Sequence, residues 1–254
     1  MTSLQSTQAV TAYVVWQDIE PLITFVKHVF AAEEVQRDIG SNGGTHCELR
    51  MGDSVVMFGG NKPGAPLLPK LIAFHIYVDD VDAVYRRAVQ AGATSMGEPA
   101  QMPYNERAGY VIDPAGNHWY IATHTGPTYF SKEPRTITPS LNIKETPGRG
   151  VEEFMRFVGD ALGIEVEARH EHDGKFRHGV LRFGGDFLEV GIGEAWAPAA
   201  ASMLLLNVND VDAAYWRALR TGAVSLMEPA NPPFGGRMAG VSDPWGNEWY
   251  LASP

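Results

Sequence analysis

The amino-acid sequence predicts an α+β fold in which a βαβββ unit occurs four times in tandem. Two observations lead to this prediction. Residues 78–122 align without a gap on residues 208–252, and twenty-four of these 45 pairs are identical. Within each copy, short apolar runs typical of strands alternate with amphipathic stretches typical of helices. Chance does not produce such a match, so the chain should contain two equivalent domains of two units each.

Upstream of this segment the two copies match more weakly. The stretch "HCELRMGDS" from His46 corresponds to "HGVLRFGGD" from His178, and "TAYVV" from Thr11 corresponds to "TPSLN" from Thr138. The join between the copies carries Gly, Pro, Ser and charged residues, which is typical of a linker. We therefore expect a flexible N-terminus over 1–9, a first domain over 10–124, a linker over 125–136 and a second domain over 137–254.

The first unit begins with "VTAYVVW", an apolar and β-branched run that predicts a strand. The next stretch, "EPLITFVKHVFAAEE", has a helical pattern that Pro21 is expected to open. "HCELRMGDSVVMFGG" then predicts two strands around a turn at Gly52-Asp53. The order of elements is thus a strand, a helix and further strands.

The second unit repeats this order. "LIAFHIYV" predicts a strand, and "DVDAVYRRAVQAGA" predicts a helix that an Asp caps and that ends at Gly92. "AGYVIDPAGNHWYIAT" predicts two strands around a turn at 113–116, where Pro and Gly fit the required backbone angles. The apolar face of the predicted helix consists of Val81, Val84, Tyr85, Ala88 and Val89.

Composition and charge exclude several classes of function. The net charge of −10 makes nucleic acid and anionic membrane surfaces unfavourable partners. No apolar run approaches the length of a membrane span, and the start lacks the pattern of a secretory signal. Cys47 is the single cysteine, so no intramolecular disulfide can form. These observations predict a cytoplasmic protein.

The tandem βαβββ units, "VDDVDA" followed by "AGA", and the closing "DPxGNxW" phrase resemble the vicinal oxygen chelate superfamily. That superfamily includes glyoxalase I, bleomycin-resistance proteins and extradiol dioxygenases. "HCELRMGDSVVMFGG" and "RAGYVIDPAGNHW" resemble its small bacterial glyoxalase-like branch. The resemblance implies open-barrel sheets with helices on the convex side and a cavity on the concave side. It also implies a covalently fused pseudo-dimer, which would be a monomer or a homodimer.

The resemblance further implies four strand positions for metal ligands, commonly His or Gln, Glu, His and Glu. These positions fall on Thr11, Met57, Ala73 and Tyr120 in the first copy, and on Thr138, Glu189, Met203 and Tyr250 in the second. Only Glu189 is of the expected type, although His75 lies two residues from Ala73 on the same strand face. The best crossed set is Thr138, Glu189, His75 and Tyr120.

That crossed set contains one carboxylate and one imidazole, whereas a divalent ion needs three or four good donors. A site without metal or cofactor is therefore expected, and a divalent metal stays open as the alternative. His118 and Glu248 share strand faces with Tyr120 and Tyr250, so a displaced metal site also stays open.

Other residues are candidates for a ligand pocket. In "HCELRM" the polar residues alternate with apolar ones, so the polar residues should face the cavity, or else form an exposed polar face. "QMPYNER" and "NPPFGGR" each place an aromatic residue and an arginine on a connection that borders the cavity in the family, or that packs as a surface loop. The predicted pocket residues are His46, Glu48, Arg50, Met57, Tyr77, Tyr104, Arg107, Tyr120, His178, Arg182, Phe234, Arg237 and Tyr250.

Three functions remain open. The first is a protein that binds a small organic molecule, antibiotic-like or aromatic and carbonyl-bearing, without a complete metal site. The second is a metal-dependent lyase, isomerase or dioxygenase of the glyoxalase type that uses His75 and Glu189 as catalytic residues. The third is a scaffold whose cavities are filled by side chains and whose surface binds another protein. His75 also has a structural interpretation, as a half-buried core histidine.

Overall fold

The computed structural model describes residues 8–40, 43–62, 68–128, 130–193, 198–233 and 235–253. It consists of two compact units. The first unit comprises residues 13–140, and the second unit comprises residues 1–12 together with residues 141–254. Most of the predicted flexible N-terminus lies outside the described residues, which begin at Gln8.

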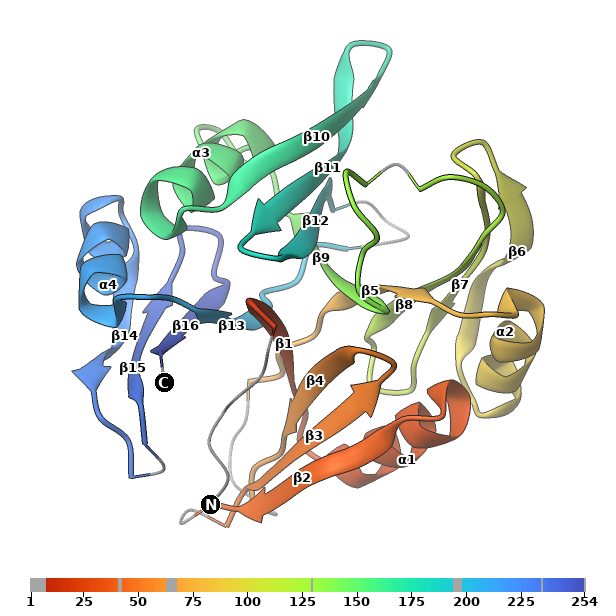
Figure 1. Cartoon of the computed structure of the whole chain (residues 1–254), viewed down its shortest axis with the longest axis horizontal. Helices are drawn as coiled ribbons and strands as arrows, with labels where there is room; N and C mark the ends of the chain where they lie inside the picture. The colour runs from red at the N-terminus through yellow and green to blue at the C-terminus, as the bar shows by residue number, and fades with distance from the viewer. Residues whose placement is uncertain are drawn as a thin grey trace. The chain divides into compact units, whose positions relative to one another are not determined.

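The βαβββ order occurs four times, as predicted (Figure 1). The first copy contains β1 (Val10–Val15), α1 (Ile19–Phe30), β2 (Glu33–Ile39), β3 (Thr45–Met51), β4 (Ser54–Gly59), β5 (Ala73–Tyr77), α2 (Val81–Gln90), β6 (Thr94–Met102), β7 (Glu106–Ile112) and β8 (His118–His124). The second copy contains β9 (Ile137–Ile143), α3 (Val151–Leu162), β10 (Glu165–His172), β11 (Lys175–Phe183), β12 (Asp186–Ile192), β13 (Met203–Asn207), α4 (Val211–Arg220), β14 (Val224–Ala230), β15 (Arg237–Ser242) and β16 (Glu248–Ser253). None of the helices in the described ranges is long and apolar enough to cross a bilayer.

The strands form open sheets in which each βαβββ unit contributes four neighbours. The order is β1-β4-β3-β2 and β9-β5-β8-β7-β6 in the first unit, and β10-β11-β12-β9 and β14-β15-β16-β13-β1 in the second. β1 and β9 each belong to both units: Val10–Ala12 pairs with β13, whereas Tyr13–Val15 pairs with β4. The opening strand of a unit runs parallel to its closing strand, as β5 does to β8 and β13 to β16.

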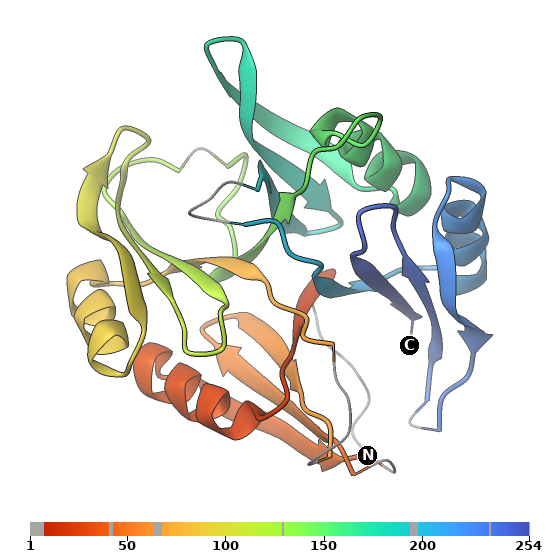
Figure 2. The same cartoon turned by 180° about the vertical axis from the view of Figure 1, so that it is seen from behind.

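The helices of each unit pack beside one another, α1 with α2 and α3 with α4 (Figures 1 and 2). Arg87 on α2 donates to the backbone carbonyl of Val29 at the end of α1, with its Nε at 2.8 Å. Arg217 on α4 does the same to Ala161 at 2.8 Å. Because carbonyls in the last turn of a helix have no partner within the helix, these arginines satisfy a group that would otherwise need water.

Two details of the predicted helices differ in the structure. α1 begins at Ile19, so Pro21 lies within its first turn and does not open the helix. Proline is tolerated there because the first-turn N–H groups have no partner within the helix. Val89 was predicted on the buried face of α2 but is 40% exposed. It follows Ala88 at the edge of the apolar stripe, beyond the reach of the sheet.

The predicted turns at Asp113 and Asp243 are built around a buried carboxylate. The Asp113 side chain accepts hydrogen bonds from the backbone N–H of Ala115 and Asn117 at 2.9 Å each. It also accepts from Asn117 Nδ2 at 3.0 Å and from Trp119 Nε1 at 2.9 Å. Burial raises the pKa of Asp113, and these four donors oppose the rise. The same four bonds recur around Asp243, so the repeated phrase has a structural role.

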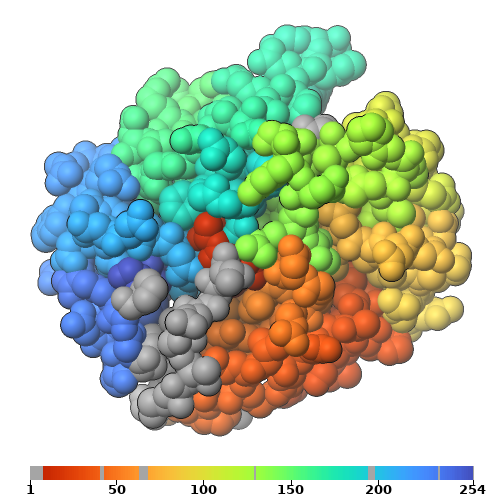
Figure 3. Space-filling model, in the orientation of Figure 1, coloured from red at the N-terminus to blue at the C-terminus, as the bar shows by residue number. Residues whose placement is uncertain are grey.

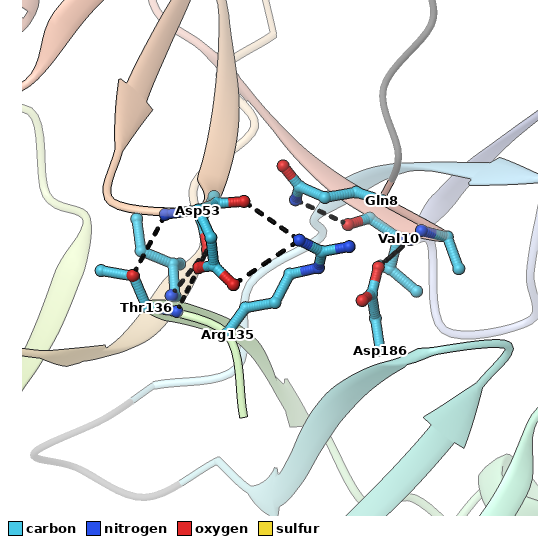
Figure 4. Close-up of polar contacts among 9 residues, drawn as sticks. Gln8, Val10, Asp53, Arg135, Thr136 and Asp186 are labelled. Carbon is cyan, nitrogen blue, oxygen red and sulfur yellow. Dashed lines mark hydrogen bonds and ion pairs between the residues drawn. The ribbon is translucent and has the colours of Figure 1, made fainter. Parts of the chain in front are cut away.

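A second pair of contacts fixes the start of the two shared strands (Figure 4). In the first unit, the Asp53 carboxylate accepts from the backbone N–H of Thr136 at 2.8 Å, and Arg135 donates to the Asp53 carbonyl at 3.1 Å. In the second unit, the Asp186 carboxylate accepts from the backbone N–H of Ala9 and Val10 at 2.5 Å and 3.2 Å. The turn that precedes β4 or β12 thus holds the chain as it enters β9 or β1.

The β10–β11 hairpin is the most prominent projection of the second unit (Figures 1 and 3). Its tip, His172–Lys175, is exposed, and Asp173 adopts a positive φ of 52° beside Gly174. The equivalent β2–β3 connection of the first copy includes residues outside the described ranges.

Candidate functional site

Two faces of the β5–β8–β7 sheet in the first unit have opposite character. Phe74 on β5 and Trp119 on β8 are register partners and stack at 4.4 Å, and Trp119 also lies 4.5 Å from Phe30 of α1. The helices therefore cover this face. Alternate residues point to the other face, because successive side chains in a strand point in opposite directions. We call these residues the polar face: His75, Tyr77, Glu106, Tyr110, His118, Tyr120 and His124.

A buried histidine–carboxylate pair lies at the centre of the polar face. His75 Nε2 lies 3.4 Å from Glu106 Oε2, an ion-pair separation longer than that of a good hydrogen bond. Tyr77 donates its hydroxyl hydrogen to the other carboxylate oxygen of Glu106 at 2.9 Å. Glu106 is fully buried and His75 is 3% exposed. Because burying ionisable groups is costly, such a pair marks a candidate functional site.

Aromatic rings surround this pair. The Tyr120 ring meets the His75 ring edge-on at 4.8 Å, and the Tyr77 ring lies tilted against it at 4.4 Å. His124 stacks on Tyr77 at 4.1 Å. The hydroxyls of Tyr104 and Tyr120 are 2.5 Å apart, so the three-residue turn between β6 and β7 reaches the polar face. The result is a surface of rings and hydroxyl groups above the buried histidine–carboxylate pair.

Tyr110 and His118 form a second hydrogen-bonded pair on the same face. Burial raises the pKa of the Tyr110 hydroxyl and lowers the pKa of His118. Both shifts favour the neutral forms at neutral pH, so an uncharged phenol and an uncharged imidazole share this hydrogen bond. This pair therefore adds polar groups to the face without adding charge.

The β1–β4–β3 sheet of the first unit carries another polar group of residues. Tyr13 OH lies 3.0 Å from His46 Nδ1, and His46 Nε2 lies 3.2 Å from Glu48 Oε1. Met57, the register partner of Tyr13 and Glu48, is 2% exposed. Arg50 turns to Glu33 on the neighbouring strand at 2.5 Å. The predicted pocket residues His46 and Glu48 are thus adjacent, whereas Arg50 pairs on the surface.

The predicted residues of the second unit group differently. His178 Nε2 lies 3.5 Å from Glu189 Oε2, and the His170 ring stacks on His178 at 5.7 Å. Arg182 forms ion pairs with Glu165 and Glu167, both on β10. Burial, followed by the charge of Glu248, raises the pKa of Tyr250. Phe234, which was also predicted to line a pocket, lies outside the described residues.

Arg107 and Arg237 hold the helices to the sheet. Arg107 forms two hydrogen bonds of 2.7 Å with the two carboxylate oxygens of Asp82 in the first turn of α2. Arg237 pairs in the same two-bonded way with Asp212 of α4. Alternation places Arg107 on the helix side of β7, opposite Glu106 and Tyr110. This placement favours a structural role over the predicted contact with a ligand.

The residues at the family's metal positions do not fit a divalent ion. In the first unit His75 is the register partner of both Thr138 and Tyr120, so the strands bring together one imidazole and two hydroxyls. In the second unit the corresponding partners are Thr11, Leu205 and Tyr250, which include no imidazole or carboxylate. Glu189 belongs to the second unit, where it pairs with His178. Within the described ranges no group of three or more His, Cys, Asp or Glu side chains could hold a metal.

An open hollow of about 560 Å³ lies elsewhere in the first unit. α1, the end of α2 and the turn at Pro114 line it, and its polar lining includes Asp18, Glu20 and His28. It contains no residue of the polar face. The lack of converging, buried polar groups makes it a weaker candidate site than the polar face.

Sequence reasoning missed four of the polar residues described above, namely Tyr13, Glu106, Tyr110 and His124. Glu106 was read as part of a connection, whereas β7 begins there. Period-two alternation extended backwards from Val111 would have placed Tyr110 and Glu106 on one face. The contrast of Glu106 with Gly236 in the second copy was a further signal.

Comparison with known proteins agrees with the fold and with the duplication. The chain is 27% identical to a Mycobacterium tuberculosis protein, the putative glyoxylase CFP32, over 227 residues. This alignment covers 85% of this chain and 83% of CFP32. An uncharacterised protein of Mycobacterium bovis is 32% identical over 123 residues, which are 44% of this chain and 81% of that protein.

Glyoxalase I from Zea mays has a similar structure, with a TM-score of 0.72 at 17% identity over 96% of this chain and 91% of that one. At this identity the similarity concerns the fold alone. The family model of the Glyoxalase/Bleomycin resistance protein/Dioxygenase superfamily matches residues 9–121 and 146–251, nearly the whole of both copies. The chain therefore belongs to the Glyoxalase/Bleomycin resistance protein/Dioxygenase superfamily.

Proposed function

We propose that the polar face of the first unit binds a small organic molecule that carries an aromatic ring and a carbonyl or hydroxyl group, without a divalent metal. Stacking rings and a few polar groups at fixed positions are the usual components of a small-molecule site. Tyr120 supplies a ring and a hydroxyl, and His75 supplies an imidazole. A planar ligand with one oxygen acceptor would match this arrangement.

The observation that carries the proposal is the buried His75–Glu106 pair. The second copy has Leu205 and Gly236 at the equivalent positions, and its half-sheet folds without any such pair. The fold therefore does not require the pair. A costly arrangement that the fold does not require is best explained by a ligand that uses it.

A thermal-shift titration tests this proposal. Phenolic and aryl-carbonyl compounds, such as 4-hydroxybenzaldehyde, should raise the melting temperature in proportion to the logarithm of their concentration. Tyr120→Phe removes one hydroxyl from the polar face and should weaken the shift. Tyr250→Phe makes the same change in the second copy and should leave it unaltered. Equal responses of the two variants, or no shift with any aromatic or carbonyl compound, would refute the proposal.

A second candidate function is catalysis of the glyoxalase type, as the name of the CFP32 relative suggests. The His75–Glu106 pair favours it, because a histidine beside a buried carboxylate can accept a proton from a ligand. A metal-dependent reaction that uses His75 and Glu189 would require more metal-donor side chains than the described residues supply. Elemental analysis of protein purified without a metal-affinity tag should find less than about a tenth of an equivalent of Ni, Zn, Mn or Fe. A stoichiometric ion would favour the metal-dependent enzyme.

A further inference from the structure

We propose that Tyr13, His46 and Glu48 form a second reactive site, in which Tyr13 is a nucleophile towards the carbonyl carbon of small acyl compounds. These residues lie on β1 and β3, and none of them belongs to the polar face on β5, β7 and β8. The inference therefore does not depend on the ligand proposed above. It concerns a separate chemistry within the first unit.

The geometry is that of a nucleophile, a base and a group that orients the base. The phenol oxygen of Tyr13 lies 3.0 Å from His46 Nδ1, and His46 Nε2 lies 3.2 Å from Glu48 Oε1. Both separations fall near the range that proton transfer requires. An ionised Glu48 can only accept a hydrogen bond, so it selects the imidazole tautomer that carries hydrogen on Nε2. Nδ1 then has a lone pair, and the Tyr13 hydroxyl donates to it.

The three residues are also open to a reagent. The side chains of His46 and Glu48 are 26% and 14% exposed, in contrast to 4% and 0% for His75 and Glu106. Tyr13 is partly exposed as well. A small reagent can therefore reach these side chains in the structure as it stands.

Gly59 on β4 provides the space in which the Tyr13 ring lies. A Cβ atom at Gly59 would come within 2.6 Å of the Tyr13 ring and 2.7 Å of its hydroxyl oxygen. These approaches are shorter than any normal van der Waals contact, so a side chain at Gly59 would displace the phenol. Gly59 is also the register partner of His46, so its missing side chain lets Tyr13 reach the imidazole.

The second copy keeps the histidine–carboxylate pair although the carboxylate comes from a different strand. Glu48 and Met57 are register partners in the first copy, and Val180 and Glu189 are the equivalent partners in the second. The carboxylate and the apolar residue have thus exchanged places across one strand pair. His178 still has a carboxylate beside it, at 3.5 Å from Glu189.

Retention of this pair through such an exchange indicates that the histidine needs a carboxylate partner. The position of Tyr13 is occupied by Ser140 in the second copy. The second copy therefore has no phenol at this position. In the first unit, contacts connect the phenol to the imidazole and the imidazole to the carboxylate.

The reaction can be written with its atoms balanced. The Tyr13 oxygen attacks the ester carbonyl carbon while its proton passes to His46 Nδ1. The tetrahedral adduct then collapses, the bond between the acyl carbon and the leaving oxygen breaks, and the electron pair leaves with an alkoxide or phenolate. The proton on His46 passes to that leaving group or to water. Tyr13 is left as an acyl ester, and Glu48 acts as a positioning residue that stabilises the transient imidazolium.

p-Nitrophenyl acetate is a suitable probe, because its leaving group absorbs visible light and its acetyl group marks the nucleophile. Tyr104, which is 40% exposed and whose hydroxyl meets that of Tyr120, provides a reference tyrosine in the same molecule. Peptide mass spectrometry at short times should show acetylation at Tyr13 about 100-fold faster than at Tyr104, the scale of general-base assistance. Equal rates at the two tyrosines in the unaltered protein would overturn the proposal.

Two variants test the role of the carboxylate. Glu48→Val should slow acetylation of Tyr13 at least about tenfold, because the tautomer of His46 is no longer fixed, and should leave Tyr104 unchanged. Adding Met57→Glu to Glu48→Val reproduces the arrangement of the second copy and should restore the Tyr13 rate. Failure of this restoration in a protein with an unaltered melting temperature would refute the role given to Glu48. The polar-face thermal shift should persist in both variants, so the two proposals can fail separately.

Discussion

The β5–β8 half-sheet of the first copy and the β13–β16 half-sheet of the second have the same strand arrangement. Their helix-covered faces carry similar residues, and their opposite faces mostly do not. On the side of the helices and turns the residues are identical: Asp113 and Asp243, Trp119 and Trp249, and Arg107 and Arg237. On the other side Tyr120 is retained as Tyr250, but the other polar-face residues differ. His75, Glu106 and His118 of the polar face have Leu205, Gly236 and Glu248 as their counterparts.

This difference separates the residues that maintain the fold from those that can serve a function. The identical residues make the same hydrogen bonds in both copies, as at the Asp113 and Asp243 turns. The divergent residues occupy positions that the fold does not constrain, since the second copy forms the same strands with Leu205, Gly236 and Glu248 there. Substitutions of the identical residues on the helix side should therefore have equal effects on stability in the two copies, and substitutions of divergent residues should not.

The largest effect is expected at the turn carboxylates. Asp113→Ala leaves two backbone N–H groups, the Asn117 amide and the Trp119 indole without their buried acceptor. The free energy of unfolding should fall by about 3–5 kcal/mol, as for other broken buried networks. Asp243→Ala should cost a similar amount. Urea or guanidinium unfolding, followed by tryptophan fluorescence, measures both.

Asp113→Asn is the control for this prediction. It keeps one acceptor oxygen and the shape of the side chain, so its loss should be smaller than that of Asp113→Ala. A difference of more than about 2 kcal/mol between the two alanine variants would show that the copies do not use the turn in the same way.

The next effect concerns the polar face, and here stability and function should separate. Glu106→Leu alone leaves His75 and Tyr77 facing an apolar group and should lower the free energy of unfolding by about 1–3 kcal/mol. Replacing all three residues, as His75→Leu, Tyr77→Phe and Glu106→Leu, removes the unsatisfied groups as well. The triple variant should be at least as stable as the original protein, because well-packed apolar residues often replace a buried ion pair without loss.

The triple variant should nevertheless lose the ligand-induced thermal shift. A stable triple variant that keeps the shift would place the ligand elsewhere. A triple variant less stable than Glu106→Leu would show that the His75–Glu106 pair stabilises the fold. That result would contradict the inference, taken from the second copy, that the fold does not require the pair.

The sequence predicted the helices, the strands and the turns well because each rests on local patterns. The Asp80 cap, for example, accepts from the backbone N–H of Ala83 at 2.9 Å, as a capping residue should. Because the sequence is repeated, the same pattern of elements was indicated by two separate segments of the chain. Period-two alternation along β8 agrees with the position of Trp119 on the helix side, where it contacts Phe30.

The site was harder to predict, because it depends on which side chains meet across strands. Arg107 was read as a pocket residue from its place after a loop, and the structure pairs it with Asp82, twenty-five residues earlier in the chain. Glu106 beside His75 likewise depends on the position of β7 in the sheet, two strands away from β5. Strand order is a long-range property that periodicity in one segment does not contain.

The smallest effect is expected at His118, whose counterpart is Glu248. Burial lowers the pKa of His118 below its ordinary value. The unfolded chain therefore binds a proton at a higher pH than the folded protein does. The contribution of His118 to stability is fully present above the unfolded pKa and is lost as the pH falls through the folded pKa.

His118→Asn isolates this contribution, because asparagine keeps an acceptor for the Tyr110 hydroxyl and does not titrate. The free energy of unfolding should fall less between about pH 7.5 and pH 5.5 in this variant than in the original protein. His170, whose pKa is also lowered by burial and by the nearby His178, contributes a change of the same sign in both proteins, so it cancels in the comparison. Identical pH dependence in the two proteins would mean that His118 is protonated as readily in the folded chain as in the unfolded one. The neutral Tyr110–His118 pair would then not distinguish the polar face from its counterpart in the second copy.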